Sequence, residues 1–202
     1  MKDRLIRFVE ESDYSTILEI YEPYIKDTSV TFECIVPSLE SFTERIKTIS
    51  ENYPYLVCLI DNKIIGYAYA QRHKARDAYQ WNAELSVYIS SSYQGYGIGK
   101  ILYSALIDIL KFQNVKNVYG VVTSPNDSSE KLHKYFGFNK LGVYHNSGYK
   151  CDSWHDVMLF EKTIGDYNFA PKPFKSIKKV DSKEISKILN KYTNTIISIN
   201  NI

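Results

Sequence analysis

The sequence has few of the residues that mark disulfide-stabilised, metal-binding or membrane-spanning proteins. Only three of its 202 residues are cysteines, Cys34, Cys58 and Cys151, and they form no CxxC pair and no cluster with histidine. Three widely spaced cysteines favour neither a disulfide framework nor a zinc site, so we expect reduced, buried thiols and no metal. No stretch approaches the roughly 18 consecutive apolar residues of a membrane span, and residues 1–13 lack the apolar core of a signal peptide. We therefore expect a cytoplasmic protein.

The chain also lacks an excess of charge of one sign. Its 25 lysines and arginines and 23 aspartates and glutamates give a formal net charge of +2. That charge is too small to favour a nucleic acid or a membrane surface as the partner. Tyrosine, in contrast, is abundant, with 18 copies, and its flat amphipathic ring is suited to lining a pocket. We expect a small-molecule partner and one compact domain with at most a small appendage.

The spacing of apolar residues predicts an α/β fold that opens with a strand and two helices. Ile6 and Phe8 alternate with polar neighbours as in a strand, and Ser12 stands where a helix of residues 14–25 would be capped. Pro37-Ser38 begins a second helix. Further strands are predicted over residues 56–60, 64–70, 83–89, 118–122, 138–144 and 155–162, and further helices over about 98–110 and 128–136.

The order strand, helix, strand over residues 83–122 predicts a parallel pair at the centre of a mixed sheet, because such crossovers return the chain to the same sheet. From about residue 165 the composition changes, with two prolines, seven lysines and an amphipathic helix. We therefore expect a domain of residues 1–164, followed by a linker and an amphipathic helix in residues 165–202. That helix either packs on its own domain, which we favour, or serves as an oligomer contact or a pocket lid.

The most informative segment lies between the predicted strand 83–89 and the helix 98–110. Its glycines let the backbone approach an anionic ligand closely, and the N–H groups at the start of the helix favour a phosphate. We therefore expect a pyrophosphate ligand, with a tight turn that binds nothing as the alternative. The segment lacks the GK[ST] ending of a P-loop and the GxGxxG spacing of a dinucleotide-binding loop. Its residues are Gln94, Gly95, Tyr96, Gly97, Ile98, Gly99 and Lys100.

This segment resembles the Q-x-x-G-x-G/A signature of the GNAT family of N-acetyltransferases, in which the turn holds the pyrophosphate of acetyl-coenzyme A. Residues 125–138, with an Asn-containing turn and a closing Gly-Phe, resemble the next motif of that family. The resemblance implies the GNAT fold, a mixed central sheet flanked by helices with a splayed parallel strand pair, and acetyl-coenzyme A as co-substrate. The cofactor contacts that it implies are Val87, Tyr88, Ile89, the turn residues 94–100, Asn126 and Ser129.

Several shorter segments are similar to the phosphinothricin acetyltransferase-like branch of the family. They are Thr31-Phe32-Glu33, residues 74–81 and 84–88, Leu132-His133, residues 148–150 and residues 154–157. The likeness covers roughly residues 4–162. It implies an acceptor that resembles glutamate or methionine, acetylated on its α-amine, and it suggests a homodimer.

Glu84 is the candidate catalytic base. An α-amine is mostly protonated near neutral pH, so acetyl transfer needs a group that removes a proton. Glu84 lies on the strand that leads into the glycine turn; taken alone, it would more often be a solvated or salt-bridged side chain. The N–H of Val87 is the expected oxyanion donor, because a fixed backbone dipole needs no reorganisation.

His133 is the second candidate catalytic residue. It stands where many GNAT relatives place a tyrosine that protonates the leaving thiolate, and the phosphinothricin-type resemblance carries a histidine there. Acid, second base, substrate contact and purely structural residue all stay open as its role. The remaining histidines, His73, His145 and His155, show no metal-binding spacing and are interpreted as structural or surface residues.

Lys74 and Arg76 are the candidate acceptor-binding residues, beside Tyr79 on a loop that the family implies closes over the substrate. An arginine can clamp a carboxylate with two hydrogen bonds, although an ordinary charged surface loop is the alternative. The remaining candidate acceptor contacts are Phe32, Ser86 and Tyr88.

These inferences predict an enzyme that transfers acetyl from acetyl-coenzyme A to the α-amine of a small amino-acid-like substrate of the phosphinothricin or methionine sulfoximine type. The attack is expected to be direct, in a ternary complex. The alternatives are the same chemistry on a polyamine or a protein N-terminus, and a non-catalytic module that binds acetyl-coenzyme A. A basic loop favours an anionic acceptor over a polyamine.

Overall fold

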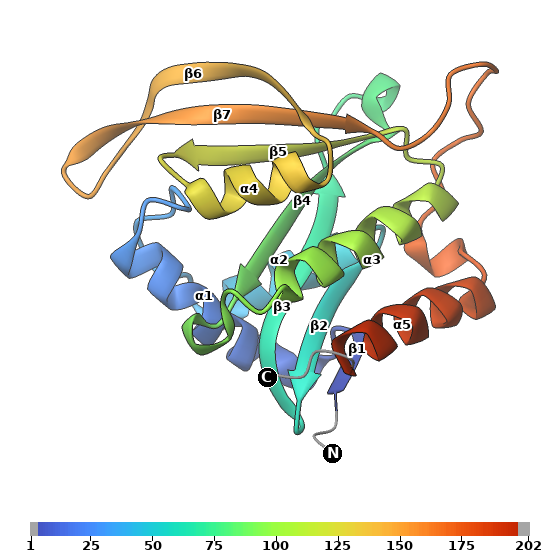
Figure 1. The fold of residues 1–202 in the computed structure, drawn as a ribbon, viewed down its shortest axis with the longest axis horizontal. Coiled ribbons are helices and arrows are strands. Elements are labelled where there is room, and N and C mark those ends of the chain that lie inside the picture. Colours follow the sequence, from blue (N-terminus) through green and yellow to red (C-terminus); the bar gives the residue numbers. More distant parts are fainter. Residues whose placement is uncertain (1–3, 198–202) are drawn as a thin grey trace.

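A seven-stranded mixed sheet with helices on both faces is described for residues 4–197 of the computed structural model (Figure 1). The strand order is β1-β2-β3-β4-β5-β7-β6. The strands are β1 (Arg4–Phe8), β2 (Tyr55–Ile60), β3 (Lys63–Arg72), β4 (Asn82–Ile89), β5 (Asn117–Ser124), β6 (Asn139–Lys150) and β7 (Ser153–Thr163). The α-helices are α1 (Tyr14–Asp27), α2 (Leu39–Ser50), α3 (Ile98–Phe112), α4 (Asp127–Tyr135) and α5 (Ser182–Ile197). The predicted α/β architecture with a parallel pair is confirmed.

The two faces of the sheet hold separate hydrophobic clusters. Helices α1 and α2 pack on one face, where their buried residues meet side chains of β2 and β3, among them Tyr55 and Tyr67. Helices α3 and α5 pack on the other face, against β1 and the centre of the sheet. Within residues 4–197 no helix is both long and apolar enough to cross a membrane.

The parallel strands β4 and β5 are paired at only three positions, which is the feature of the fold that creates the site. The last pair joins Glu84 to Tyr119, after which β4 continues to Ile89 and β5 to Ser124 without further pairing to each other. Beyond Glu84, β4 stays paired to β3 on its other side. The predicted splay of the parallel pair is therefore present.

The start of α1 differs from the sequence-based expectation. A short 3₁₀ turn, Glu11–Asp13, precedes the helix, and Asp13 stands at the N-cap in place of Ser12. The Asp13 carboxylate accepts two hydrogen bonds from Arg7, at 2.6 and 2.9 Å, and one from the Glu10 N–H at 2.7 Å. The predicted cap at Ser12 is wrong, because the carboxylate next to it ties the start of the helix to β1.

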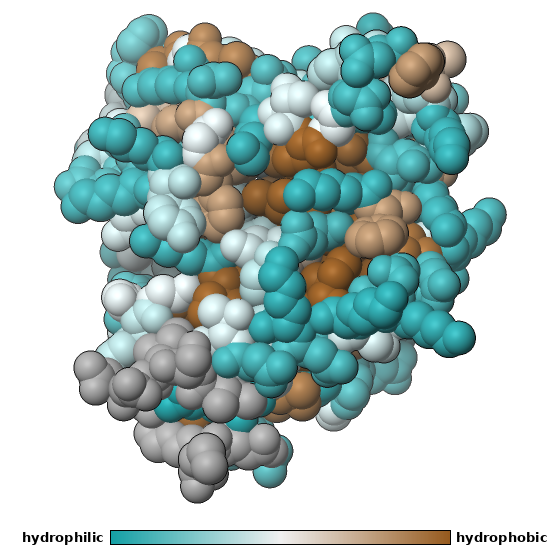
Figure 2. Space-filling view, turned by 45° about the vertical axis from the view of Figure 1, so that its right-hand side comes forward, coloured by the Kyte–Doolittle hydropathy of each residue, from teal (hydrophilic) through white to brown (hydrophobic). Residues whose placement is uncertain are grey.

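The tail after β7 shares the core of the domain through residue 196. Ile185, Ile188 and Ile196 of α5 are buried in the same cluster as α3. The α5 helix also covers the edge strand β1, because the Ile6 N–H donates to the hydroxyl of Thr193 at 3.0 Å. Hydrophilic side chains cover much of the face that carries these helices, with hydrophobic surface between them (Figure 2).

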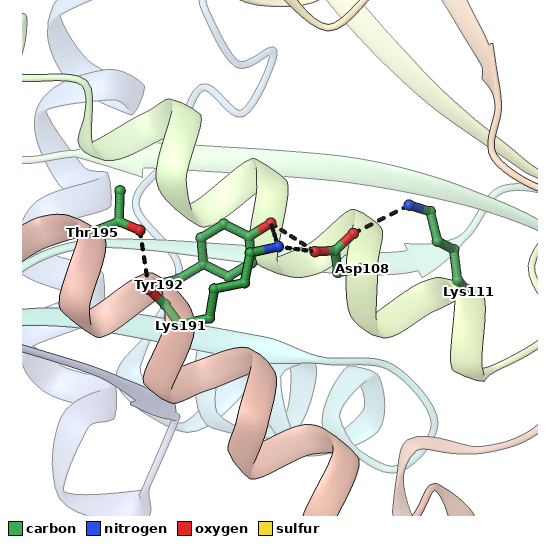
Figure 3. Close-up of polar contacts among 5 residues, drawn as sticks. All are labelled: Asp108, Lys111, Lys191, Tyr192 and Thr195. Atoms are coloured by element: carbon green, nitrogen blue, oxygen red, sulfur yellow. Dashed lines mark hydrogen bonds and ion pairs between the residues drawn. The ribbon is translucent and has the colours of Figure 1, made fainter.

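A carboxylate at Asp108 joins α3 to α5 (Figure 3). It accepts hydrogen bonds from the Tyr192 hydroxyl at 2.7 Å, from Lys191 Nζ at 3.0 Å and from Lys111 Nζ at 3.2 Å. Thr195 donates to the Lys191 carbonyl one helical turn away. Burial opposes ionisation of Asp108, but these three donors outweigh it and lower its pKa.

We predict that Asp108→Asn lowers the free energy of unfolding at pH 7 by about 1 kcal/mol, because one partly exposed charge-assisted contact is lost. A lowered folded-state pKa stabilises above the unfolded pKa of about 4, and this contribution disappears as the pH falls through the folded value. Urea unfolding of wild type and variant should therefore converge below about pH 4. Asp27→Asn, an exposed carboxylate at the end of α1, is the control; an equal loss there would contradict the prediction.

Candidate functional site

A narrow cavity of about 70 Å³ fills the gap between the splayed halves of β4 and β5. Strand β4 contributes Leu85 through Tyr88, strand β5 contributes Gly120 through Val122, and α4 closes the third side. The α4 residues on this wall are Asn126, the N-cap, with Ser129, Leu132 and His133. The predicted cofactor residues Val87, Tyr88, Asn126 and Ser129 therefore line one cavity.

The backbone of β4 beside the gap is partly bonded to tyrosine hydroxyls. The Tyr24 hydroxyl donates to the Ile89 carbonyl at 2.6 Å and accepts from the Ile89 N–H at 3.2 Å. The Tyr103 hydroxyl lies 3.5 Å from the Leu85 carbonyl. Because every second residue of a strand turns its backbone polar groups to the same side, Val87, between these two positions, presents its N–H and C=O to the gap.

The glycine turn lies beside the splayed end of β4. Gly95 and Gly97 have φ angles of +84° and +82°, a left-handed conformation that glycine adopts without strain. Gly97 is the N-cap of α3, whose first N–H groups have no acceptor within the helix and carry the positive end of its dipole. An anion is the natural partner for such a turn.

The other residues of the turn have structural contacts of their own. Gln94 Nε2 donates to the Tyr24 hydroxyl at 3.0 Å, Ile98 is buried, and Lys100 Nζ lies 4.0 Å from the centroid of the Tyr135 ring on α4. Tyr96 is exposed, and Gly99 lies next to Val87 and Ile89. The turn is thus held to both α1 and α4.

His133 is buried in an aromatic cage on the α3 side of the sheet. Its ring stacks on Phe160 at 4.7 Å and meets the edge of Phe138 at 4.8 Å. Nδ1 donates to the Ser129 carbonyl at 2.8 Å, so Nε2 is left to accept from the Tyr103 hydroxyl at 3.2 Å. Burial lowers the pKa of His133, against the opposing effect of the Ser129 carbonyl. The imidazole is therefore neutral near pH 7.

Glu84 stands at the last paired position of β4 and β5, on the other face of the sheet, and does not line the cavity. Its side chain is 24% exposed; Gln71 Nε2 donates to Oε1 at 3.3 Å, and Oε2 lies 3.6 Å from His73 Nδ1. Burial raises the pKa of Tyr103 on the opposite face, and the charge of Glu84 raises it further. The two predicted catalytic residues thus lie on opposite sides of the sheet at the start of the gap.

Tyrosine rings form the wall beyond Glu84. Tyr88 stacks on Tyr67 at 5.2 Å and meets the edges of Tyr21 and Tyr24. Ser86 stands between Glu84 and Tyr88 on the same side of β4. These four rings are among the 18 tyrosines that make this residue abundant in the sequence.

The loop between α1 and α2 carries Phe32 and docks on the β6–β7 hairpin. Lys150 is buried and donates from Nζ to the Thr31 carbonyl at 2.7 Å. Phe32 packs on Gly148 so closely that a Cβ at residue 148 would lie 2.3 Å from its ring. Glu33 accepts hydrogen bonds from Arg45 of α2. The structure therefore fixes Phe32 between a helix and a hairpin.

Lys74, Arg76 and Tyr79 lie on the exposed loop between β3 and β4, directly after His73. Lys74 Nζ lies 4.9 Å from the centroid of the Tyr79 ring. Arg76 is exposed and precedes the 3₁₀ turn Asp77–Tyr79. The three residues are close in sequence to Glu84, but none of them lines the cavity in the gap.

Sequence reasoning missed the residues that support these side chains. Gln71 and His73 contact Glu84, Tyr103 contacts His133, and Arg45 and Lys150 hold the Phe32 loop. Lys150 lies in the family-like segment 148–150, and Tyr103 lies on the helix that follows the glycine turn, but neither segment assigned these side chains a role. Arg45 comes from α2, which carries no motif. In the part of the chain that the structure describes, no group of three or more His, Cys, Asp or Glu side chains is arranged to hold a metal ion. The expectation of buried thiols holds for Cys58 but is wrong for Cys34 and Cys151, which are exposed on loops.

Comparison with known proteins finds relatives that are named as acetyltransferases. The phosphinothricin N-acetyltransferase of Streptomyces viridochromogenes is 30% identical over 175 residues, covering 87% of this chain and 95% of that protein. The L-methionine sulfoximine/L-methionine sulfone acetyltransferase of Salmonella typhimurium is 26% identical, covering 80% and 95%. A phosphinothricin acetyltransferase from Sinorhizobium meliloti, solved with acetyl-coenzyme A, superposes with a TM-score of 0.81 at 31% identity, covering 84% and 94%.

The acetyltransferase (GNAT) domain family matches residues 6–159, which include the gap, the glycine turn and α4. The chain belongs to the GNAT family of acetyltransferases.

Proposed function

We propose that this acetyltransferase transfers acetyl from acetyl-coenzyme A to the α-amine of a small, anionic amino acid, of the phosphinothricin or methionine sulfoximine type, by direct attack in a ternary complex. The observation that carries the proposal is the position of Val87, which faces the gap between the glycine turn and Glu84. The names of the relatives support the acceptor class. A polyamine or protein N-terminus is the alternative acceptor.

Acetyl-coenzyme A is the co-substrate that the gap fits. The pyrophosphate would lie against the N–H groups at the start of α3, from Gly97 to Lys100, where the helix dipole stabilises it. The pantetheine arm would extend β4 by bonding to the N–H and C=O of Val87, as an added strand does. The Asn126 side chain, whose Oδ1 caps α4 through the Ser129 N–H at 3.0 Å, has its amide nitrogen left for the arm.

Glu84 is proposed to remove the proton that holds the acceptor amine inactive. Its carboxylate takes one proton from the ammonium group, and the freed lone pair attacks the thioester carbonyl. As the C–S bond breaks, the second proton leaves the nitrogen and protonates the departing thiolate. The Val87 N–H would then donate to the oxyanion as it forms. Lys74 and Arg76 are proposed to bind the acceptor's acidic groups, with Tyr79 beside them.

His133 is proposed to act at the thioester end through Tyr103. Since its Nδ1 donates to a carbonyl and burial lowers its pKa, His133 is proposed to act as a neutral imidazole. The Tyr103 hydroxyl, which donates to His133 Nε2, can turn to the sulfur as negative charge develops there. This neutral pair would stabilise the leaving thiolate.

We further propose a homodimer and a supporting role for the tail. The exposed Tyr149 and Trp154 on the β6–β7 hairpin, 5.5 Å apart edge to face, support an interface between copies. The tail, residues 165–202, follows the proposed catalytic unit of residues 1–164, and its Lys172 carbonyl accepts from Trp81 Nε1 at 2.8 Å, beside the acceptor loop. The cytoplasmic location expected from the sequence stays a prediction.

The acceptor proposal is tested by following free thiol while pure protein is mixed with acetyl-coenzyme A and phosphinothricin, methionine sulfoximine, a polyamine or an N-terminal peptide. We expect thiol release with the first two. Release only with the polyamine or the peptide would replace the proposed acceptor, and release with none would argue for a non-catalytic binding module.

The base assignment is tested by Glu84→Gln, which keeps the shape and the hydrogen bond to Gln71. We expect kcat to fall about 100-fold, the low end for general base catalysis, with the KM for acetyl-coenzyme A nearly unchanged. Glu19→Gln, an exposed residue of α1, is the matched control. Wild-type turnover in Glu84→Gln would remove Glu84 as the base.

The close packing of His133 is tested through its neighbour Gly120. A Cβ at residue 120 would lie 2.0 Å from His133 Nε2 and within 2.8 Å of two more ring atoms, in a cage with no room to yield. We expect Gly120→Ala to cost about 1–3 kcal/mol of stability and to slow turnover. Gly142→Ala, where a Cβ meets nothing within 4 Å, is the control, and equal behaviour of the two variants in urea unfolding would refute the prediction.

A further inference from the structure

One histidine beside the proposed base has a polar atom that the fold leaves unpaired. His73 follows β3, and its Nδ1 is buried without a hydrogen-bond partner among the described residues. Its ring is stacked on Tyr119 of β5, with centroids 4.1 Å apart and planes within 7°. A buried nitrogen without a hydrogen-bond partner destabilises the folded protein, which suggests that this nitrogen has a function.

The carboxylate of Glu84, the proposed base, lies close to this nitrogen. Glu84 Oε2 lies 3.6 Å from His73 Nδ1, while Gln71 holds the other carboxylate oxygen. This distance exceeds a hydrogen bond, but contacts of catalytic groups are often long before the substrate binds. The His73 side chain is 18% exposed, which gives it a route to water.

The other charged groups around His73 are engaged elsewhere. On β7, Glu161 accepts the hydroxyl of Tyr119 at 2.6 Å. On β3, Arg72 donates to Asp77 at 3.1 Å and to the Lys74 carbonyl at 2.9 Å, and the Lys74 ammonium group lies over the Tyr79 ring. The Glu84 carboxylate is the charged group left facing Nδ1.

We infer that His73 is the second proton acceptor of the reaction, which takes the substrate proton from Glu84 and passes it to water. The inference rests on the proposed function. A neutral imidazole that carries its proton on Nε2 has a lone pair on Nδ1. The ammonium proton moves to Glu84 Oε2 as the amine attacks; the Glu84 O–H then donates it to His73 Nδ1, and Nε2 releases its own proton to solvent. Proton exchange with solvent after product release then restores the tautomer that carries its proton on Nε2. Glu84 is thereby returned to the carboxylate before the next acceptor binds.

The relay also explains the stacking on Tyr119. A parallel ring 4.1 Å away fixes the plane of the imidazole, and in this plane Nδ1 lies on the side of Glu84. The hydroxyl of Tyr119 is turned away to Glu161, so it does not compete for the nitrogen.

The test is chemical rescue of His73→Ala, which leaves a gap over Tyr119. We expect kcat for the phosphinothricin-type acceptor to fall at least about tenfold, with the KM for acetyl-coenzyme A little changed, and added imidazole to restore it in a concentration-dependent way. His145→Ala is the matched control, since His145 is 75% exposed and pairs with Asp156. Turnover of His73→Ala within twofold of wild type, or a loss that imidazole does not restore, would overturn the inference.

A second variant separates proton transfer from simple positioning. His73→Asn keeps a side chain that can hydrogen bond to Glu84 but cannot carry a proton to water. We expect the kcat of this variant to stay low and not to rise when imidazole is added. Full activity in His73→Asn would show that residue 73 only holds the carboxylate and would overturn the relay.

A measurement without turnover distinguishes this inference from the proposed function. Nitrogen-15 NMR of the wild-type protein should find the neutral His73 ring protonated on Nε2; a proton on Nδ1 would contradict the relay whatever the acceptor. Absence of acceptor-dependent thiol release from wild type would instead contradict the proposed function. Thiol release with an Nδ1-protonated His73 would leave that function standing and reject the relay alone.

Discussion

The site depends on the early end of the pairing between β4 and β5. After Glu84 and Tyr119 the strands separate, and a strand edge inside a protein must satisfy its backbone N–H and C=O groups in another way. Tyr24 takes both groups of Ile89, and the Tyr103 hydroxyl approaches the Leu85 carbonyl. Val87 lies between these two hydroxyls, and the proposed function assigns its N–H and C=O to acetyl-coenzyme A.

The separation of β4 and β5 places a buried histidine on one face of the sheet and a partly exposed glutamate on the other. On the α3 side, His133 is packed among aromatic rings, where burial keeps the imidazole neutral. On the other side, Glu84 stays partly exposed and is contacted by Gln71 and His73. A desolvated donor pair and a hydrated acid–base pair suit the opposite demands of a leaving thiolate and an attacking amine. A continuous parallel pair would keep these two sets apart.

The tail extends a fold that the family describes only up to residue 159. Its last helix covers the edge strand β1, where the hydroxyl of Thr193 accepts the Ile6 N–H that a neighbouring strand would otherwise bond. The segment before that helix is fixed to the body by side chains of the domain, such as Asn114, which donates to the Pro173 carbonyl at 2.8 Å. Edge protection and support of the acceptor loop therefore come from one added segment.

The sequence by itself determined what depends on near neighbours in the chain: the strand and helix periods, the start of α2 at Pro37-Ser38, the glycine turn between β4 and α3, and the family. It misplaced the cap of α1, because Arg7 on β1 decides that Asp13 and not Ser12 stands there. Only the tertiary structure brought Phe32 onto Gly148 and Tyr103 onto His133, and stacked His73 on Tyr119 while it faced Glu84. Most of these contacts join residues tens of positions apart, on strands and helices whose apolar patterns fix the fold but do not specify which polar atoms meet across it.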